Sequence, residues 1–344
     1  MEDQMGVHAM VDSVALFSGT PVLVIGDMVA DVYLDGQISR ISREAPVLVL
    51  EQMGERVVPG GAANVANNAA TLGGAVYAAG ICGADTSGTQ LVSVLAGNGV
   101  QTEGLLRDAA LPTITKTRIV AGGRATVSQQ IVRVDREWHA KPGRLSEEAL
   151  LSYVRGALSK VRGVVLSDYG SGTVTARIRR TVIDAARAAG IPSIVDSRYD
   201  ILSYKGIGYV KQNDAELAAA LGRSLSSEEE LYAAGRELKM RLRADGVLIT
   251  RGEKGMTLFL SDGAAIDIPV SDHSEIFDVS GAGDTCVAAM LLALAAGVAP
   301  VTAAHLSNYA SGIAVRKRGT ATVSQAELCA AVAGAAREEG GGIC

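Results

Sequence analysis

The sequence predicts an α/β protein built on one large, mainly parallel β-sheet, with a second, smaller β-sheet beside it. From about residue 146 onward, short apolar runs alternate with helical patterns, and this alternation indicates parallel strands joined by right-handed crossovers. Segment Val29–Val58 instead shows strand-like alternation and β-branched runs without a helical period. Because aromatic residues make up only 4% of the chain, we expect a core of Val, Ile, Leu and Ala.

The core elements follow from local patterns taken in order. Pro21–Gly26 is a continuous apolar run, which suits a parallel strand covered on both faces. Pro59-Gly60-Gly61 then breaks the chain ahead of an Ala-rich helix over Ala62–Leu72. The remaining patterns predict strands Val76–Ala79, Val164–Ser167, Ile194–Asp196, Tyr209–Lys211 and Gly246–Thr250, a hairpin over Gly255–Ile268, and helices Ser87–Gly97, Ser146–Lys160, Val174–Ala189, Asp214–Leu221, Ser227–Leu242, Ala282–Ala295, Pro300–Val315 and Ser324–Ala336.

A small sheet is expected to project from the core as a lid. Segment Val29–Val58 supplies some of its strands, and Ile114–Val120 with Val127–Val134 reads as a hairpin that turns at Gly122-Gly123. We therefore expect this organisation: an α/β core of residues 14–28, 59–113 and 135–336, a β-lid of residues 29–58 and 114–134, and a flexible tail of residues 337–344.

Composition excludes several classes of partner. A net charge of −5 and a pI near 5.5 provide no basic surface for nucleic acid or an anionic membrane. The longest apolar stretch, Val287–Ala296, is about half of a bilayer span. The N-terminal segment has no basic region of the kind that opens a signal peptide, and the four cysteines lie far apart. We expect a cytoplasmic protein with reduced thiols and no membrane or nucleic-acid partner.

Polar residues follow five of the expected strands at the point where each strand ends. These are Gly26-Asp27, Ser167-Asp168, Val195-Asp196, Gln212-Asn213 and Thr250-Arg251-Gly252. In an open α/β sheet, ligands bind at the carboxyl ends of the strands. Any one of these pairs suits a turn, but five in the same topological position predict a common cleft.

The segment FDVSGAGDT, residues 277–285, is the strongest candidate for catalytic chemistry because it leads directly into an apolar helix. Gly281, Ala282 and Gly283 place several free N–H groups at a helix N-terminus, which suits a phosphoryl group. Asp284 would lie in the first turn, where it could accept a proton from an attacking hydroxyl. The alternative is that Asp284 only caps the helix.

Two further groups of polar residues suit sugar and phosphate binding. Gly60 and Gly61 open a helix that carries Asn64 in its first turn, which would place amide groups over a polyol, unless this is only a Gly-rich cap. Asn213 and Glu216 lie three residues apart at the start of another helix. Such a pair can organise Mg²⁺ through water, or it can form a capping box.

Other catalytic classes lack their motifs. The nucleotide-binding pattern G-x-x-x-x-G-K-[ST] is absent, and no G-x-G-x-x-G with a downstream acidic residue follows the first strand. A dehydrogenase is therefore disfavoured. Ser280 is not in a G-x-S-x-G elbow, so a hydrolase has no support.

The pairing of GGAANVANNAATLGG (residues 60–74) with DVSGAGDT (278–285) resembles the ribokinase family, the phosphofructokinase-B-like sugar kinases. Within it, VVLSDYGSGTV, LITRGEKGM and GTATVSQAEL are similar to the heptose kinases of lipopolysaccharide-core synthesis. Those enzymes use ATP to phosphorylate O1 of D-glycero-D-manno-heptose 7-phosphate. The resemblance implies a three-layer α/β/α core with a β-sheet lid. It also implies the stand-alone kinase form, without a C-terminal adenylyltransferase, and a homodimer clasped through the lids.

The resemblance also implies a role for each matching residue. Asp284 would be the catalytic base, and the amides of Gly281, Ala282 and Gly283 would form an anion hole. The implied nucleotide contacts are Asn213, Glu216, Arg198, Thr250, Gly252, Gly255 and Asn308, with Asn213 and Glu216 also holding Mg²⁺ through water. The implied sugar contacts are Asp27, Asp31, Gly60, Gly61 and Asn64, and the implied 7-phosphate contacts are Arg40, Arg43, Lys116, Arg118 and Arg133.

The chain departs from its relatives at two positions. Ser171 stands where close relatives have a lysine in DYAKG, and Arg198 stands where they have the lysine of DPK; Arg198 could replace the latter against the nucleotide phosphates. A monovalent cation could lie near Asp278 and the Gly319–Ser324 loop. The alternatives are a family member that acts on ribose, a nucleoside or a fructose phosphate, or a catalytically silent regulator that binds sugar or nucleotide.

Overall fold

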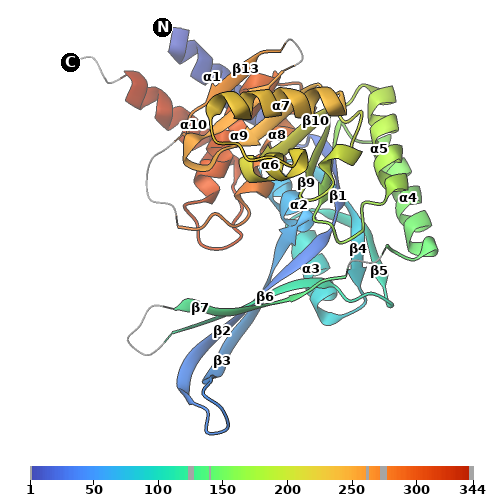
Figure 1. The fold of residues 1–344 in the computed structure, drawn as a ribbon, viewed down its shortest axis with the longest axis vertical. Helices are drawn as coiled ribbons and strands as arrows, with labels where there is room; N and C mark the ends of the chain where they lie inside the picture. The colour runs from blue at the N-terminus through green and yellow to red at the C-terminus, as the bar shows by residue number, and fades with distance from the viewer. Residues whose placement is uncertain (1, 123–127, 139–140, 261–262, 272–276, 341–344) are drawn as a thin grey trace.

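A nine-stranded sheet forms the centre of the computed structural model, which describes residues 2–122, 128–138, 141–260, 263–271 and 277–340 (Figure 1). The strand order is β13-β12-β11-β10-β9-β8-β1-β4-β5. Its strands are β1 (Pro21–Gly26), β4 (Ala75–Gly83), β5 (Gln101–Asp108), β8 (Gly163–Asp168), β9 (Ser193–Ser197), β10 (Tyr209–Asn213), β11 (Gly246–Thr250), β12 (Met256–Phe259) and β13 (Ala265–Ile268). All neighbours from β11 to β5 pair in parallel, and only β12 and β13 pair antiparallel. The mainly parallel sheet is confirmed.

Helices cover both faces of this sheet. The side chains of β1 alternate between two apolar clusters, with Val22 and Val24 on one face and Leu23 and Ile25 on the other. The first face packs against α1 (Glu2–Ala15), α2 (Ala62–Thr71), α3 (Thr86–Gly97), α8 (Ala282–Ala295), α9 (Pro300–Ala314) and α10 (Gln325–Gly340). The second packs against α4 (Arg144–Leu158), α5 (Ala176–Ala189), α6 (Asp214–Leu221) and α7 (Glu228–Leu242). The three-layer core is therefore confirmed.

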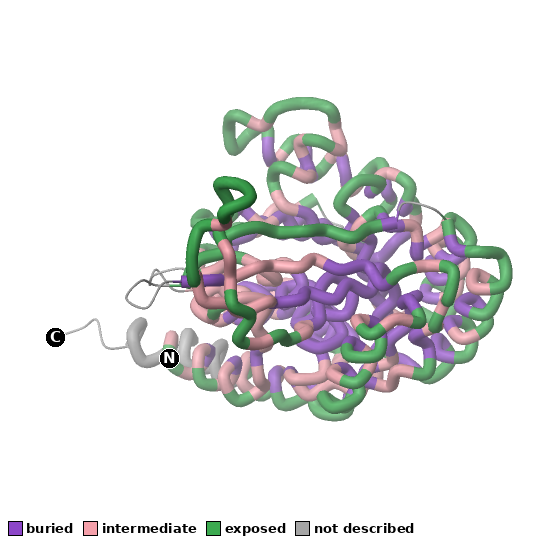
Figure 2. Tube along the Cα trace, turned by 90° about the horizontal axis from the view of Figure 1, so that it is seen from below, coloured by how far each residue is buried: buried purple, intermediate pink, exposed green. Residues whose placement is uncertain are grey.

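A separate four-stranded sheet projects from this core (Figure 1). It consists of β2 (Met28–Ile41), β3 (Leu48–Gly61), β6 (Ile114–Gly122) and β7 (Gln129–Arg136) in the order β3-β2-β6-β7. We call it the lid sheet. Its outer strand β7 is exposed along its whole length, whereas β1 in the core is almost wholly buried (Figure 2). Pairing of β6 with β7 is antiparallel, as the sequence predicted for this hairpin.

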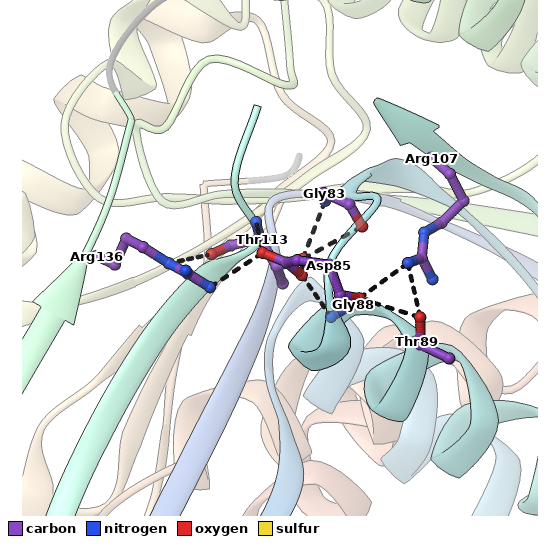
Figure 3. Close-up of polar contacts among 7 residues, drawn as sticks. All are labelled: Gly83, Asp85, Gly88, Thr89, Arg107, Thr113 and Arg136. Carbon is purple, nitrogen blue, oxygen red and sulfur yellow. Dashed lines mark hydrogen bonds and ion pairs between the residues drawn. The ribbon is translucent and has the colours of Figure 1, made fainter. Parts of the chain in front are cut away.

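Asp85 joins the base of the lid sheet to the core (Figure 3). Its side chain caps α3 by accepting the Gly88 amide hydrogen at 2.9 Å, and it accepts hydrogen bonds from the hydroxyl and the amide of Thr113, just before β6. Arg136, at the end of β7, completes the network with an ion pair to Asp85 at 3.1 Å. Because one carboxylate is bonded to a core helix, to the residue ahead of β6 and to β7, the lid sheet is anchored at its base.

Two elements were not predicted from the sequence. Strand β5 has few apolar residues in its segment QTEGLLRD, and helix α1 precedes the first strand. Helix α10 runs to Gly340, so residues 337–340 are helical where a flexible tail was expected; residues 341–344 lie outside the described part. None of the described helices is both long enough and apolar enough to cross a bilayer.

Candidate active site

The polar strand ends lie side by side at one edge of the large sheet. Strand register pairs Gly26 of β1 with Ser167 of β8, and Ser167 with Asp196 of β9. Asp196 in turn pairs with Lys211 of β10. Two residues further along β10, Asn213 pairs with Thr250, the last residue of β11. Adjacent parallel strands thus bring residues that are far apart in sequence to a common edge, and the common cleft stays a prediction.

Two glycines at the start of α8 lie close to polar side chains. Gly281 has a φ of 80°, and a Cβ there would lie 2.7 Å from Nδ2 of Asn64. A Cβ on Gly283 would lie 2.7 Å from Nζ of Lys211. The missing side chains therefore let an amide group from α2 and an ammonium group from β10 approach the helix N-terminus.

Asp284 lies in the first turn of α8 and is only 4% exposed. Nδ2 of Asn64 donates to its Oδ2 at 2.8 Å, and the hydroxyl of Tyr169 donates to its Oδ1 at 2.8 Å. Burial raises the pKa of Asp284 to about 6, although both hydrogen bonds act to lower it. The carboxylate is therefore mostly ionised at neutral pH, and each oxygen keeps a lone pair for a substrate hydroxyl.

Lys211 supplies a buried positive charge beside this helix start. Its ammonium is paired with Asp196 at 2.9 Å, and the two side chains are only 9% and 13% exposed. Burial opposes the charged form, but the Asp196 carboxylate outweighs it and raises the pKa of Lys211 above its usual value. A cation at this position would stabilise charge on a phosphoryl group bound at α8. Sequence reasoning missed it, although Lys211 shares a strand face with Asn213 two residues on.

Asn213 and Glu216 form a capping box at the start of α6. The Asn213 side chain accepts the Glu216 amide hydrogen at 2.7 Å, and the Glu216 carboxylate accepts that of Asn213 at 2.9 Å. Burial raises the pKa of Glu216, and the charge of nearby Asp196 adds to the effect. Within the described residues, no three His, Cys, Asp or Glu side chains cluster as a metal site. Asn213 and Glu216 therefore fit a Mg²⁺ ion that has few carboxylate ligands and keeps several waters.

A cavity of about 430 Å³ brings together most of the expected nucleotide contacts. It lies between the loop after β11, helix α9 and the start of α8, and its lining includes Thr250, Gly252, Gly255, Asn308, Ala282 and Gly283. The amide of Asn308 donates to the carbonyl of Pro269 at 2.6 Å. Asn213, Glu216 and Arg198 do not line this cavity. We call it the nucleotide cavity, after those expected contacts.

Asp27 is fully buried and holds the loop after β8. Its Oδ2 accepts the amide hydrogens of Tyr169 and Ser171 at 2.9 and 3.1 Å, and its Oδ1 accepts that of Thr173 at 3.1 Å. The resemblance implies contact with a sugar hydroxyl, which stays a prediction, and in this arrangement Asp27 positions the loop that carries Tyr169. Tyr169 was itself missed, although it follows β8 directly in the DYGSG segment.

Asp31 forms a buried cluster at the base of β2. Arg118 lies 2.9 Å from its Oδ1, and the Thr320 hydroxyl donates to its Oδ2 at 3.0 Å. A Cβ on Gly60 would lie 2.9 Å from Cγ of Asp31, so glycine permits the close packing. Gly61 adjoins it as the N-cap of α2. Arg118 is therefore paired with Asp31, and its role as a phosphate contact stays a prediction.

The three other expected phosphate arginines differ in their surroundings. Arg133 is paired with Asp135 on the exposed strand β7. Arg40 lies nine residues beyond Asp31 on β2, which is about 30 Å along a strand, and Arg43 lies in the loop that follows. Arg40 and Arg43 therefore lie far along the lid sheet from Asp31, whereas Arg133 is the cross-strand neighbour of Arg118.

Lys116 and Arg198 both lie over a single aromatic ring instead. The Lys116 ammonium is 5.2 Å from the centroid of the Tyr169 ring, and the Arg198 guanidinium carbon is also 5.2 Å from it. Both residues line a cavity of about 440 Å³ that is separate from the nucleotide cavity.

Asp278 ties two loops together at the other side of the α8 start. Its Oδ1 accepts the Ser280 amide hydrogen at 2.9 Å, and its Oδ2 accepts that of Gly319 at 3.1 Å. These bonds lower the pKa of Asp278 despite partial burial. The carboxylate is therefore ionised and joins the two segments that the sequence associated with a monovalent cation.

Comparison with known proteins agrees with this architecture. A family model described as "pfkB family carbohydrate kinase" matches residues 20–327. The "Bifunctional protein HldE" of Azorhizobium caulinodans is 42% identical over 314 residues, covering 91% of this chain and 64% of that protein. The protein of the same name from Geobacter metallireducens is 43% identical over 307 residues, covering 89% of this chain and 61% of that protein. The chain thus spans less than two thirds of the length of these relatives.

Solved structures show the same fold at low identity. Arabidopsis thaliana ribokinase complexed with ribose and ATP has a TM-score of 0.70 at 20% identity, covering 91% of this chain and 99% of that one. Escherichia coli phosphofructokinase-2 in complex with potassium has a TM-score of 0.72 at 22% identity, covering 93% and 100%.

Proposed function

Because the chain belongs to the pfkB family of carbohydrate kinases, we propose that it transfers the γ-phosphoryl group of ATP to O1 of D-glycero-D-manno-heptose 7-phosphate. The product would be the 1,7-bisphosphate, an intermediate toward ADP-heptose and the lipopolysaccharide inner core. The observation that carries the proposal is the buried Asp284 carboxylate at the start of α8, beside both the nucleotide cavity and the Lys211 ammonium.

Asp284 takes the proton from O1 as that oxygen attacks the γ-phosphorus. Tyr169 and Asn64 hold the carboxylate from two sides, so it meets the hydroxyl in a fixed orientation. The amides of Gly281 and Gly283 then donate to the phosphoryl oxygens as negative charge spreads over them. The amide of Ala282, expected in the same role, donates to the carbonyl of Val279 at 3.3 Å. Lys211 adds a nearby positive charge.

Magnesium would be held by water-mediated contacts from Glu216 and Asn213 and by the ATP phosphates, and it would neutralise phosphate charge. A monovalent cation beside Asp278 would act on the same helix start by fixing the loop at Gly319. Removal of Mg²⁺ by a chelator is expected to abolish turnover, and replacement of K⁺ by a bulky organic cation tests the second site.

A substrate panel and one substitution test the proposal. We expect turnover of the heptose 7-phosphate to exceed that of ribose, adenosine and fructose 1-phosphate. Asp284→Asn should lower turnover by about 10²- to 10⁴-fold while calorimetric titration shows unchanged ATP affinity. The matched control is Asp184→Asn, on an exposed face of α5. Persistent turnover in the Asp284 variant would refute the assigned base, and a wild-type chain that binds ATP without phosphorylating any sugar would favour a regulator.

The lid sheet is the proposed interface of a homodimer. Several large apolar side chains of its strands and of the loop between β2 and β3 are exposed, including Ile41, Val47, Met53, Ile131 and Val134. Val47 is 56% exposed, so packing against its own subunit does not cover it. We expect sedimentation equilibrium to give a dimer, and Val47→Glu with Met53→Glu to give a monomer; a wild-type monomer would contradict the interface.

A further inference from the structure

The loop between α9 and α10 contacts both the lid sheet and the start of α8. It carries Thr320, whose partner Asp31 is 289 residues away in the chain. The core holds this loop beside those contacts, where the Lys317 ammonium donates to the carbonyl of Thr322 at 2.7 Å and pairs with Glu327 of α10 at 2.6 Å. The loop therefore presents Thr320 to the lid sheet from a fixed position on the core.

Two side chains on one face of β2 meet this loop. Asp31 and Tyr33 are two residues apart on the strand, so they point to the same side. The Thr320 hydroxyl donates to Oδ2 of Asp31 at 3.0 Å. Gly319 has a φ of 69°, and a Cβ there would lie 3.0 Å from the hydroxyl oxygen of Tyr33. The lid sheet thus approaches the loop at two consecutive residues.

The same two loop residues contact the segment that leads into α8. The Gly319 amide donates to Oδ2 of Asp278 at 3.1 Å, and Oδ1 of Asp278 accepts the Ser280 amide hydrogen at 2.9 Å. The methyl carbon of Thr320 lies 2.8 Å from the position that a Cβ on Gly281 would take, so it packs directly against that glycine. Because Gly281 is the N-cap of α8, Thr320 supports a residue whose amide is proposed to bind phosphoryl oxygens.

Thr320 connects Asp31 to a part of the chain outside the lid sheet. The other partner of Asp31, Arg118, comes from the adjacent lid strand β6, so it belongs to the same sheet. Asp31 is only 4% exposed, and a buried carboxylate that loses a donor is left with its desolvation cost. The positions of Asp31 and of the loop therefore constrain each other.

We propose that Thr320 is a positioning residue that couples the acceptor side of the site to the start of α8. Its hydroxyl orients Asp31, and its methyl group supports the backbone at Gly281. This inference rests on the proposed function, in which Asp31 contacts the sugar and Gly281 contacts the phosphoryl group. A ligand that restrains one end restrains the other. Because binding linkage is reciprocal, sugar and nucleotide should raise each other's affinity by the same factor.

Calorimetric titration of the full chain measures this factor. The heptose 7-phosphate is titrated with and without a non-hydrolysable ATP analogue, and the analogue should raise the sugar affinity of the wild type roughly 5- to 20-fold. Thr320→Val keeps the methyl contact and removes only the hydroxyl, so the factor should fall to within about twofold of unity. Thr320→Ser keeps the donor to Asp31 and the Gly319–Asp278 hydrogen bond but loses the methyl contact, so its factor should lie between the other two.

Thr117→Val is the matched control. It removes a hydroxyl from lid strand β6 one residue before Arg118, and therefore on the opposite face of the strand. Its coupling factor should equal that of the wild type. An equal loss in Thr117→Val and Thr320→Val would assign the effect to the lid sheet as a whole and overturn the role of Thr320.

Two other results would overturn the proposal. Equal factors for the wild type and Thr320→Val would do so even if both ligands bound more weakly, because a purely structural role lowers each affinity without changing their linkage. A wild-type factor of one would mean that the two ends of the site are not coupled at all.

Failure of the proposed function has a different signature. If the wild-type chain phosphorylates no sugar, hydrogen exchange with and without the ATP analogue still tests the connection through Thr320. The analogue should slow amide exchange both near the start of α8 and in β2 of the wild type, and only near α8 in Thr320→Val. Equal protection of β2 in both chains, or none in the wild type, refutes the coupling.

Discussion

Replacing Tyr169 with phenylalanine should move the pH profile of the enzyme. The substitution removes the hydroxyl that donates to Oδ1 of Asp284 at 2.8 Å and helps to lower the pKa of that carboxyl. A hydrogen bond to a charged group contributes about 1.5–3 kcal/mol, and one pKa unit corresponds to about 1.4 kcal/mol. The pKa of Asp284, about 6 in the wild-type chain, should therefore rise by roughly one to two units.

The sign of the effect follows from the role of Asp284. A general base acts when deprotonated, so kcat/KM falls as the pH drops through the pKa of the free enzyme. The acid limb of Tyr169→Phe should therefore lie near pH 7 to 8. Activity should fall roughly two- to tenfold at pH 7 and recover above about pH 9. The assay is kcat/KM for the sugar, measured by coupled ADP release across this range.

Tyr232→Phe is the matched control, because the Tyr232 hydroxyl also bonds a carboxylate, that of Asp267 on the edge strand β13, away from Asp284. Its acid limb should stay near pH 6. If Tyr169→Phe loses the same factor at every pH, or keeps its limb near pH 6, the tyrosine does not act through the ionisation of Asp284.

Three further substitutions probe the same edge of the sheet. Gly281→Ala forces a side chain into a φ of 80° and against Asn64, so urea denaturation should show a loss of about 1–3 kcal/mol; unchanged stability would contradict the close approach. Lys211→Met leaves the Asp196 carboxylate buried without its partner and should cost about 3–5 kcal/mol. Adding Asp196→Asn should restore stability but not turnover, and a fully active double variant would exclude a catalytic role for the ammonium. Asn213→Ala removes the α6 cap and should cost about 0.5–2 kcal/mol by the same measurement, whereas no loss would mean that the capping box contributes nothing.

Much of the fold follows from local sequence patterns. Helix α8 and strand β11 have the bounds that their apolar patterns indicated, Ala282–Ala295 and Gly246–Thr250. Strand β5 was missed because its many polar residues do not give a strand pattern. Its pairing with β4 in the large sheet makes it a strand. Helix α1 was missed because it precedes the first recognisable strand.

The candidate site divides in a similar way. The GAGD segment identified Asp284 and the helix start, because glycines directly ahead of an apolar helix are typical of a helix N-terminus that binds a phosphoryl group. Patterns could not show that Asp27 would hold a loop or that Arg118 would be paired with Asp31. They also could not reveal Tyr169, whose partner Asp284 is 115 residues away in the chain.

The amino-acid sequence by itself determined the element types, the parallel sheet and the chemistry at the strand ends, because periodicity and glycine placement act through neighbours in the chain. Only the tertiary structure decided which charge meets which partner. Lys211 is paired with Asp196, while Lys116 and Arg198 both lie over the ring of Tyr169. The physical reason is that electrostatic interactions depend on distance and burial in space, and strand order, rather than position along the chain, sets both.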